Sequence, residues 1–445
     1  MPDLYIRCSS KFRIVLLILM ISMDWSCISI RHNYIGPSVN YNPDLIPQKA
    51  PSIGEKLLDR QMSDSLLHII SELKRHGHHI PARELNQLYT VFGEQLNNDR
   101  YYQNLLQTGF FNPDSLNAIQ YSATLELLSS AANYEKSYQK NRLVRRSLNR
   151  GDSGNNIPKS VLRKSQNYLF APSVRKTLEK QREKHKTTEI DSMFSLLPQT
   201  NTLKALHHKV FKHNDRIHDL LNNSVYAGSY VVGNTIGMFH EATDRKPKAD
   251  QLFPYLRPYD LVVMKSSNHL TSQFIPGYFG HVGIWLGNEL ASQLDGKSSK
   301  NSDFAGSGMV EVLRSGTRIS TLEEFTDGDI FLIIRPRKLI PKQKLSILTN
   351  LGKQLSKEYD FNFDIESSER IMCTELVYLA YDFVDWETRY TWSRFTLSPD
   401  DLVLTALEDS RFEFPVYLEN NEAISHPSPK FLQSLVGQPD QLSNK

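Results

Sequence analysis

A chain of 445 residues is too long for one ordinary hydrophobic core, so two or three domains are expected. Its composition, 40% hydrophobic and 23% charged, is typical of a soluble protein, and we find no apolar run long enough to cross a bilayer as a helix. The formal net charge of +3 is too small to indicate a polyanionic partner, so no nucleic acid is expected to bind.

The N-terminus has the pattern of an export signal. A basic segment, Arg7–Arg13, precedes an apolar run of about ten residues that ends before Asp24. Cys27 follows this run and resembles the acylated cysteine of a bacterial lipoprotein, although Asp24 departs from that pattern. Residues 1–27 are therefore predicted to be a signal peptide, with lipidation of Cys27, plain secretion or a short anchor as alternatives. The protein would then be an exported cell-envelope protein, either a membrane-anchored lipoprotein or periplasmic.

The next two hundred residues contain helical patterns without motifs for chemistry. Residues 28–52 are rich in Pro, Asn and Tyr and are predicted to form a flexible tether. Residues 53–148 have apolar residues at helical spacing and are interpreted as a helical module, serving as a spacer or for partner binding. Residues 149–240 form a basic, mainly helical connection. Its charges are expected to lie on solvated helix faces, with an anionic lipid surface as the alternative partner.

The pattern changes at about residue 250, where short β-type runs alternate with polar loops. The runs, which predict an antiparallel meander, are Leu261–Met264, Val282–Leu286, Met309–Leu313 and Ile330–Ile334. Helices are predicted afterwards, including one that starts at Cys373 and one capped by Ser398. The fold class is therefore α+β, with an antiparallel sheet packed on helices over 250–425, and 426–445 is expected to be a disordered tail.

Cys373 is a candidate nucleophile. In a helix, Cys373, Leu376 and Val377 share one face, so the thiol would point inward from the first turn. The unpaired backbone N–H groups and the helix dipole favour a thiolate at that position. A buried structural cysteine would show the same pattern.

His281 and Glu311 are candidate partners of this thiol. On a strand, His281 and Gly283 share one face, and the glycine is expected to leave room for a helix or a substrate. Glu311 stands inside an otherwise apolar strand, where a neighbouring imidazolium would explain its presence. A position facing solvent is the alternative for Glu311.

Several motifs in this region resemble one known family. They are LRPYDLVVMKSS, GHVGIWLG, a strand with an internal glutamate, YDFNF and CTELVYLAY, with the histidine preceding the cysteine. This order resembles the permuted papain-like hydrolases of the YaeF/YiiX type, relatives of NlpC-type cell-wall peptidases, over Leu256–Leu407. The resemblance implies a circularly permuted papain-like domain in which Cys373 is the nucleophile, His281 the base and Glu311 the residue that orients the base.

Such a site would form an acyl-enzyme from an amide or ester. We predict an amidase, acting in the cell envelope on peptidoglycan stem peptides. A lipid acyl hydrolase or acyltransferase is the first alternative, because the fold is shared with relatives of lecithin:retinol acyltransferase, and a catalytically idle binding scaffold is the second. Tyr278, Trp285 and Glu375 are candidate substrate contacts, although packing and a polar helix position also explain them. No cofactor and no metal are expected, since the cysteine and histidines lack ligand spacing.

Overall fold

The computed structural model describes most of the chain between residues 53 and 436. The described ranges are 53–107, 118–138, 141–169, 249–265, 277–295, 307–326, 328–391, 394–419 and 422–436, with a few single positions between 176 and 191. The predicted signal peptide with Cys27, the tether and most of the basic connection lie outside these ranges. Within them, no helix combines the length and the apolar character that crossing a membrane requires.

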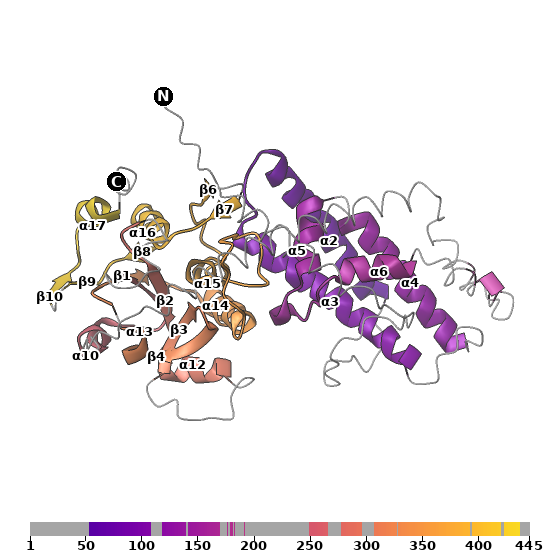
Figure 1. Cartoon of the computed structure of the whole chain (residues 1–445), viewed down its shortest axis with the longest axis horizontal. Helices are drawn as coiled ribbons and strands as arrows, with labels where there is room; N and C mark the ends of the chain where they lie inside the picture. Colours follow the sequence, from indigo (N-terminus) through magenta and orange to yellow (C-terminus); the bar gives the residue numbers. More distant parts are fainter. Residues whose placement is uncertain are drawn as a thin grey trace, which may run out of the picture. The chain divides into compact units, whose positions relative to one another are not determined.

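The first described part is helical (Figure 1). Its elements are α2 (Ile53–Arg75), α3 (Ala82–Gln107), α4 (Ala118–Tyr138), α5 (Arg142–Arg150), η2 (Ser153–Asn155) and α6 (Val161–Leu169). Aromatic rings join these helices, since Phe92 contacts the rings of Tyr134 and Tyr138 edge-on with centroids 5.3 and 5.0 Å apart. Helix α5 runs across the predicted boundary at residue 148, and the proposed division of the chain into domains stays a prediction.

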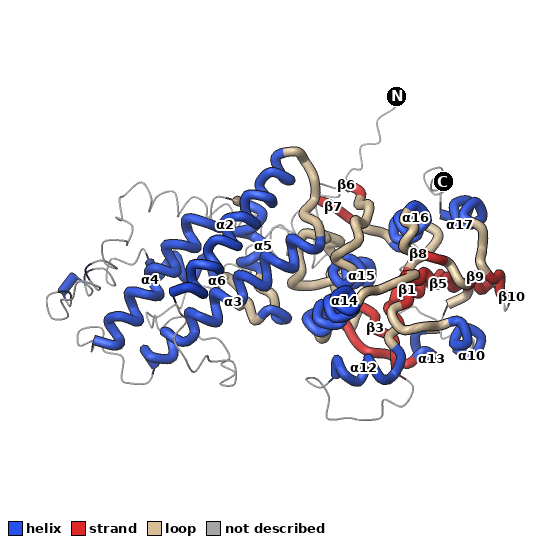
Figure 2. The backbone as a smooth tube through the Cα atoms, turned by 180° about the vertical axis from the view of Figure 1, so that it is seen from behind, coloured by secondary structure: helices blue, strands red, loops and turns tan. Residues whose placement is uncertain are grey.

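The second part is built on an eight-stranded antiparallel sheet (Figures 1 and 2). Its main strands are β1 (Asp260–Lys265), β2 (His281–Trp285), β3 (Ser307–Leu313), β4 (Gly316–Thr321), β5 (Ile330–Pro336), β9 (Val416–Glu419) and β10 (Glu422–Ser425). They lie in the order β10-β9-β5-β1-β2-β3-β4, and β8 (Phe412–Glu413) pairs with β5. A separate small sheet pairs β6 (Arg389–Thr391) with β7 (Arg394–Thr396).

The predicted meander is wrong in one respect. The fourth predicted run, β5, does not follow β3 in the sheet but pairs with β1 on its other side. The strand next to β3 is β4, whose sequence GTRIST is too polar to be recognised as a strand from its apolar residues. Two polar side chains of β4, Arg318 and Ser320, donate hydrogen bonds to Glu311 of β3.

Helices cover both faces of the sheet (Figure 2). They are α10 (Ala249–Leu252), η3 (Phe253–Tyr255), α12 (Gly287–Asp295), α13 (Leu322–Phe325), α14 (Pro341–Gln354), α15 (Cys373–Ala380), α16 (Pro399–Glu408) and α17 (Pro429–Val436). One apolar cluster joins α14 and α15 to Val282 and Ile284 of β2. A second cluster on the opposite face joins Trp285, Met309 and Phe325. The α+β prediction, with a helical region before an antiparallel sheet packed on helices, is confirmed.

Helix α17 corrects the expectation of a disordered tail over 426–445. The helix contacts α16, and its Leu432 is fully buried in the core. Its short amphipathic run, PKFLQSLV, buries only Leu432 and Val436, which is too weak a pattern to separate from a polar tail by sequence. Residues 437–445 lie beyond the described part of the chain.

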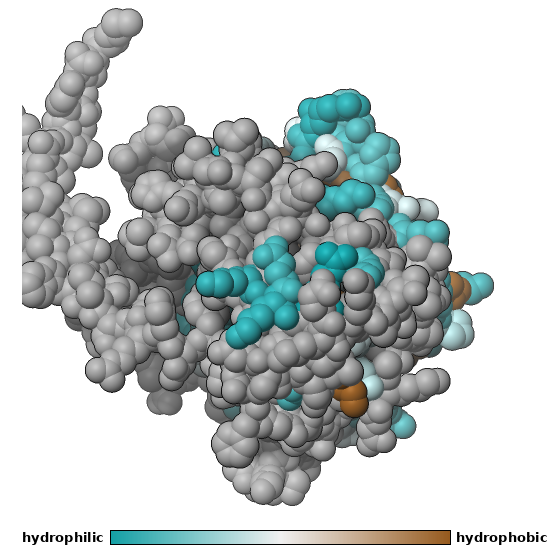
Figure 3. All heavy atoms as spheres, turned by 90° about the vertical axis from the view of Figure 1, so that its right-hand side faces the viewer, coloured by the Kyte–Doolittle hydropathy of each residue, from teal (hydrophilic) through white to brown (hydrophobic). Residues whose placement is uncertain are grey.

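The helices before residue 170 share the core of the sheet domain. Tyr378 of α15 donates its hydroxyl hydrogen to the carbonyl oxygen of Ile80, with an O···O distance of 2.6 Å. Lys357 and Asp152 form an ion pair of 2.7 Å in which both side chains are fully buried. On the one face drawn in Figure 3, the described residues are mainly hydrophilic. Burial therefore joins α2, α3 and α5 to α15 in a common core.

Candidate active site

Strand register brings His281 and Glu311 together. Gly283 of β2 lies opposite Glu311 of β3, and His281 is two residues away from Gly283 on the same face. Side chains in such diagonal positions can touch. Nε2 of His281 lies 3.0 Å from Oε2 of Glu311, a hydrogen-bonding distance, and the histidine side chain is 16% exposed.

The carboxylate of Glu311 is held in its charged form by three neighbours. Its Oε1 accepts hydrogen bonds from Ser320 Oγ and from Nε and a terminal nitrogen of Arg318, the latter two at 3.3 and 3.2 Å. Burial raises the pKa of Glu311, but the hydrogen bonds from His281 and Ser320 and the charges of His281 and Arg318 lower it overall. A charged, fully bonded glutamate can therefore orient the imidazole.

Cys373 is the first residue of α15 and is 2% exposed. The position at the helix start places its sulfur where unpaired backbone N–H groups favour negative charge. Burial lowers the pKa of His281, but hydrogen bonds to Cys373 and Glu311, together with their charges, raise it to about 10. Because Nε2 faces Glu311, Nδ1 is the ring nitrogen left for the thiol. The arrangement favours a thiolate–imidazolium pair.

The loop before His281 is fixed by a carboxylate that sequence reasoning missed. Asp400, in the first turn of α16, accepts hydrogen bonds from the backbone N–H groups of Tyr278 and Phe279 at 2.6 and 2.8 Å. Gly277 has φ of 137°, and a Cβ there would lie 2.5 Å from Asp400. The helix cap at Ser398 is predictable from the sequence, but no local signal connects Asp400 to a loop more than one hundred residues earlier.

The space beside Gly283 is filled by protein side chains. A Cβ at this position would lie 2.7 Å from both Met309 Sδ and Phe325 Cε2. The glycine therefore admits Met309 and Phe325, and because Phe325 is the last residue of α13, a short helix rather than a substrate occupies this space. Phe325 also contacts the ring of His281 at a centroid distance of 5.6 Å, so this packing restricts the imidazole on one side.

The three predicted substrate contacts do not form one surface. Trp285 is 5% exposed and belongs to the apolar cluster of its sheet face. Glu375 is 1% exposed, and its Oε2 accepts a hydrogen bond from Met372 N at 2.9 Å. Tyr278 is partly exposed, and its hydroxyl oxygen lies 2.9 Å from that of Tyr417. Of these three residues, Tyr278 therefore has the most exposed side chain and is the one that a substrate could reach most easily.

An antiparallel sheet with a cysteine-bearing helix on one face, and a strand histidine that precedes the cysteine in sequence, is the arrangement expected of a permuted papain-like domain. Residues 255–427 match a family model described as permuted papain-like amidase enzyme, YaeF/YiiX, C92 family. This match confirms the resemblance inferred from the sequence motifs and supports a hydrolase of the amidase type. Neither a curated protein nor a solved structure matches the chain.

Replacing Glu311 by glutamine is expected to lower the pKa of His281 from about 10 toward the ordinary histidine value of about 6.5. The substitution keeps the side-chain size but removes the negative charge beside the imidazolium. Titration of His281 by nuclear magnetic resonance would measure the change. Glu324→Gln is a matched control, because Glu324 also faces Arg318, at 3.8 Å, but is half exposed. An unchanged titration in Glu311→Gln would contradict the orienting role.

Proposed function

We propose that this protein is a cysteine amidase in which Cys373 is the nucleophile, His281 the general base and acid, and Glu311 the orienting residue. The observation that carries the proposal is the position of His281, whose Nε2 lies 3.0 Å from the buried, charged carboxylate of Glu311 and whose pKa is raised by the neighbouring Cys373 and Glu311. A histidine held in this way can keep a thiolate beside it and later return the proton.

The reaction follows from these positions. The thiolate of Cys373 attacks the amide carbonyl carbon, and the negative charge on the carbonyl oxygen faces the backbone N–H of Cys373 at the start of α15. The imidazolium of His281 donates a proton to the leaving amine, so the C–N bond breaks and a thioester remains. A water molecule then gives its proton to His281 and attacks the thioester, which releases the acid and restores the thiolate.

A peptide amide fits the site better than an acyl lipid. Phe279 and Trp285, two of the aromatic residues that could form an apolar substrate edge, are 1% and 5% exposed and belong to the core. The motif resemblance to cell-wall peptidases and the signal-like N-terminus favour a peptidoglycan stem peptide as substrate. The proposed location is accordingly the cell envelope, with attachment to the membrane through Cys27 as part of the proposal.

The rate of thiol alkylation tests the nucleophile without knowledge of the substrate. At pH 6.5, iodoacetamide is expected to modify Cys373 about ten times faster in the wild type than in His281→Ala, since the thiolate needs the imidazolium. Because the pKa of His281 is raised to about 10, the rate is expected to change little until the pH approaches that value.

Two variants serve as controls in this measurement. Cys373→Ala gives the background from other thiols, and His68→Ala removes an exposed histidine of α2. A rate that is the same with and without His281 would contradict the amidase proposal and would favour an idle binding scaffold.

A further inference from the structure

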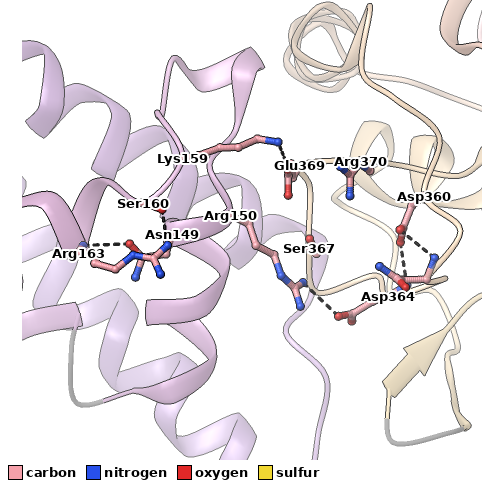
Figure 4. Close-up of a pocket in the computed structure, with 11 residues that line it drawn as sticks. Asn149, Arg150, Lys159, Ser160, Arg163, Asp360, Asp364, Ser367, Glu369 and Arg370 are labelled. Carbon is pink, nitrogen blue, oxygen red and sulfur yellow. Dashed lines mark hydrogen bonds and ion pairs between the residues drawn. The ribbon is translucent and has the colours of Figure 1, made fainter. Parts of the chain in front are cut away.

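A polar pocket whose lining includes neither Cys373 nor His281 lies between the end of the helical part and the loop that precedes α15 (Figure 4). Its volume is about 270 Å³, and every residue that lines it is polar or charged. The lining residues are Asn149, Arg150, Lys159, Ser160, Arg163, Asp360, Asn362, Asp364, Ser367, Glu369 and Arg370. The pocket therefore has no apolar wall for an acyl chain and is suited to a small polar ligand.

The walls of this pocket carry opposite charges that face each other. Arg150 of the helical part lies 3.5 Å from Asp364 of the loop, and Lys159 forms an ion pair with Glu369 (Figure 4). The Arg150–Asp364 distance is long for a strong ion pair, and the Lys159 side chain is 69% exposed. Both pairs are thus weak enough for a ligand to replace them.

Two further ion pairs connect the helical part to the loop region, the two segments that form the walls of the pocket. The buried pair of Lys357 with Asp152 ties the loop region to the helical part, and Lys74 binds Glu366 at 2.7 Å. The carboxylate of Asp360 is 4% exposed and accepts hydrogen bonds from the backbone N–H groups of Asn362 and Asp364. These contacts fix the loop backbone, so a ligand would meet charges that are already positioned.

We propose that this pocket is a second binding site, for a zwitterion such as a free amino acid or the end of a short peptide. The carboxylate of the ligand would bind Arg150, and its ammonium group would bind Asp364 or Glu369. With Asp364 as the partner of the ammonium group, the two new ion pairs would replace the single Arg150–Asp364 pair, so both side chains keep a partner of opposite charge. The volume lies near the lower end of the range for small-molecule sites, about 300–1,000 Å³, which matches a ligand of this size.

Isothermal titration calorimetry tests the proposal on the full chain, in the Cys373→Ala background so that no acyl-enzyme can form. The probe is the dipeptide alanyl-glutamate, and its N-acetylated form and its fully amidated form remove one kind of charge each. We expect the dipeptide to bind and each modified form to bind about tenfold more weakly or worse, a loss of about 1.4 kcal/mol. Free glutamate as a further probe distinguishes an amino-acid site from a peptide-end site.

Variants locate the binding. Arg150→Gln combined with Asp364→Asn is expected to weaken binding of the dipeptide about tenfold or more. The matched control is Arg337→Gln combined with Glu413→Gln, which removes an exposed ion pair elsewhere and is expected to change nothing. Absence of binding up to about 10 mM, or binding unaffected by the pocket variants, would overturn the proposal.

Discussion

Replacement of Cys373 by serine is expected to reduce amide hydrolysis by about 10⁴-fold or more, because a hydroxyl beside this histidine is a far weaker nucleophile than a thiolate. The serine is close in size to the cysteine and fits the same buried position at the start of α15. The loss should therefore fall on kcat, while the affinity for substrate changes little.

The release of soluble fragments from purified peptidoglycan would measure this loss. The melting temperature of Cys373→Ser serves as the control for folding and is expected to stay close to that of the wild type. Hydrolysis that continues at a comparable rate in the serine variant would remove Cys373 from the mechanism. If the wild type itself releases nothing, the substrate proposal fails, and the alkylation experiment still decides whether the thiol is activated.

Replacement of Lys357 by methionine is expected to destabilise the protein by about 3–5 kcal/mol, because it leaves the buried charge of Asp152 without its partner. Nζ of Lys357 lies 2.7 Å from Asp152 and also donates a hydrogen bond to the carbonyl oxygen of Ser368 at 2.6 Å. Both partners of the ion pair are fully buried, so water cannot replace the lost interactions.

Denaturant midpoints and melting temperatures would measure the change in stability. Arg337→Met is the matched control, because it breaks an exposed ion pair with Glu413 and should cost no more than about 1 kcal/mol. Combining Lys357→Met with Asp152→Asn should destabilise less than the sum of the two single variants, since the uncompensated charge is then absent. Equal losses of stability in Lys357→Met and Arg337→Met would contradict the prediction that the buried ion pair stabilises the protein more than the exposed one.

Local patterns predicted the elements that carry the site. The helical spacing after Cys373 and the alternation around His281 correspond to α15 and β2, and Ser398 caps α16 through its bond to the N–H of Asp401. These signals lie within a few residues of each other, so the sequence alone contains them. The pairing of β2 with β3 depends on the loop between them, and only the structure gives the register that brings Glu311 to His281.

Contacts between distant segments could not be predicted in the same way. Arg318 and Ser320 support Glu311 from a strand that has almost no apolar residues. Glu366 binds Lys74, a residue 292 positions earlier, and no pattern in either segment indicates the other. The basic residues Arg150, Lys159 and Arg163 of the second pocket were predicted to lie on solvated helix faces, because the acidic residues that face them belong to a loop two hundred residues further along.

The shared core between α3 and α15 has a consequence for the order of folding. During synthesis, Ile80 and the apolar face of α3 are complete nearly 300 residues before Tyr378, whose hydroxyl group donates a hydrogen bond to the carbonyl oxygen of Ile80. Contacts of such large sequence separation form slowly, because a long loop must close before they add stability. The apolar surface of the early helices that packs against α15 therefore stays uncovered until α15 has been made.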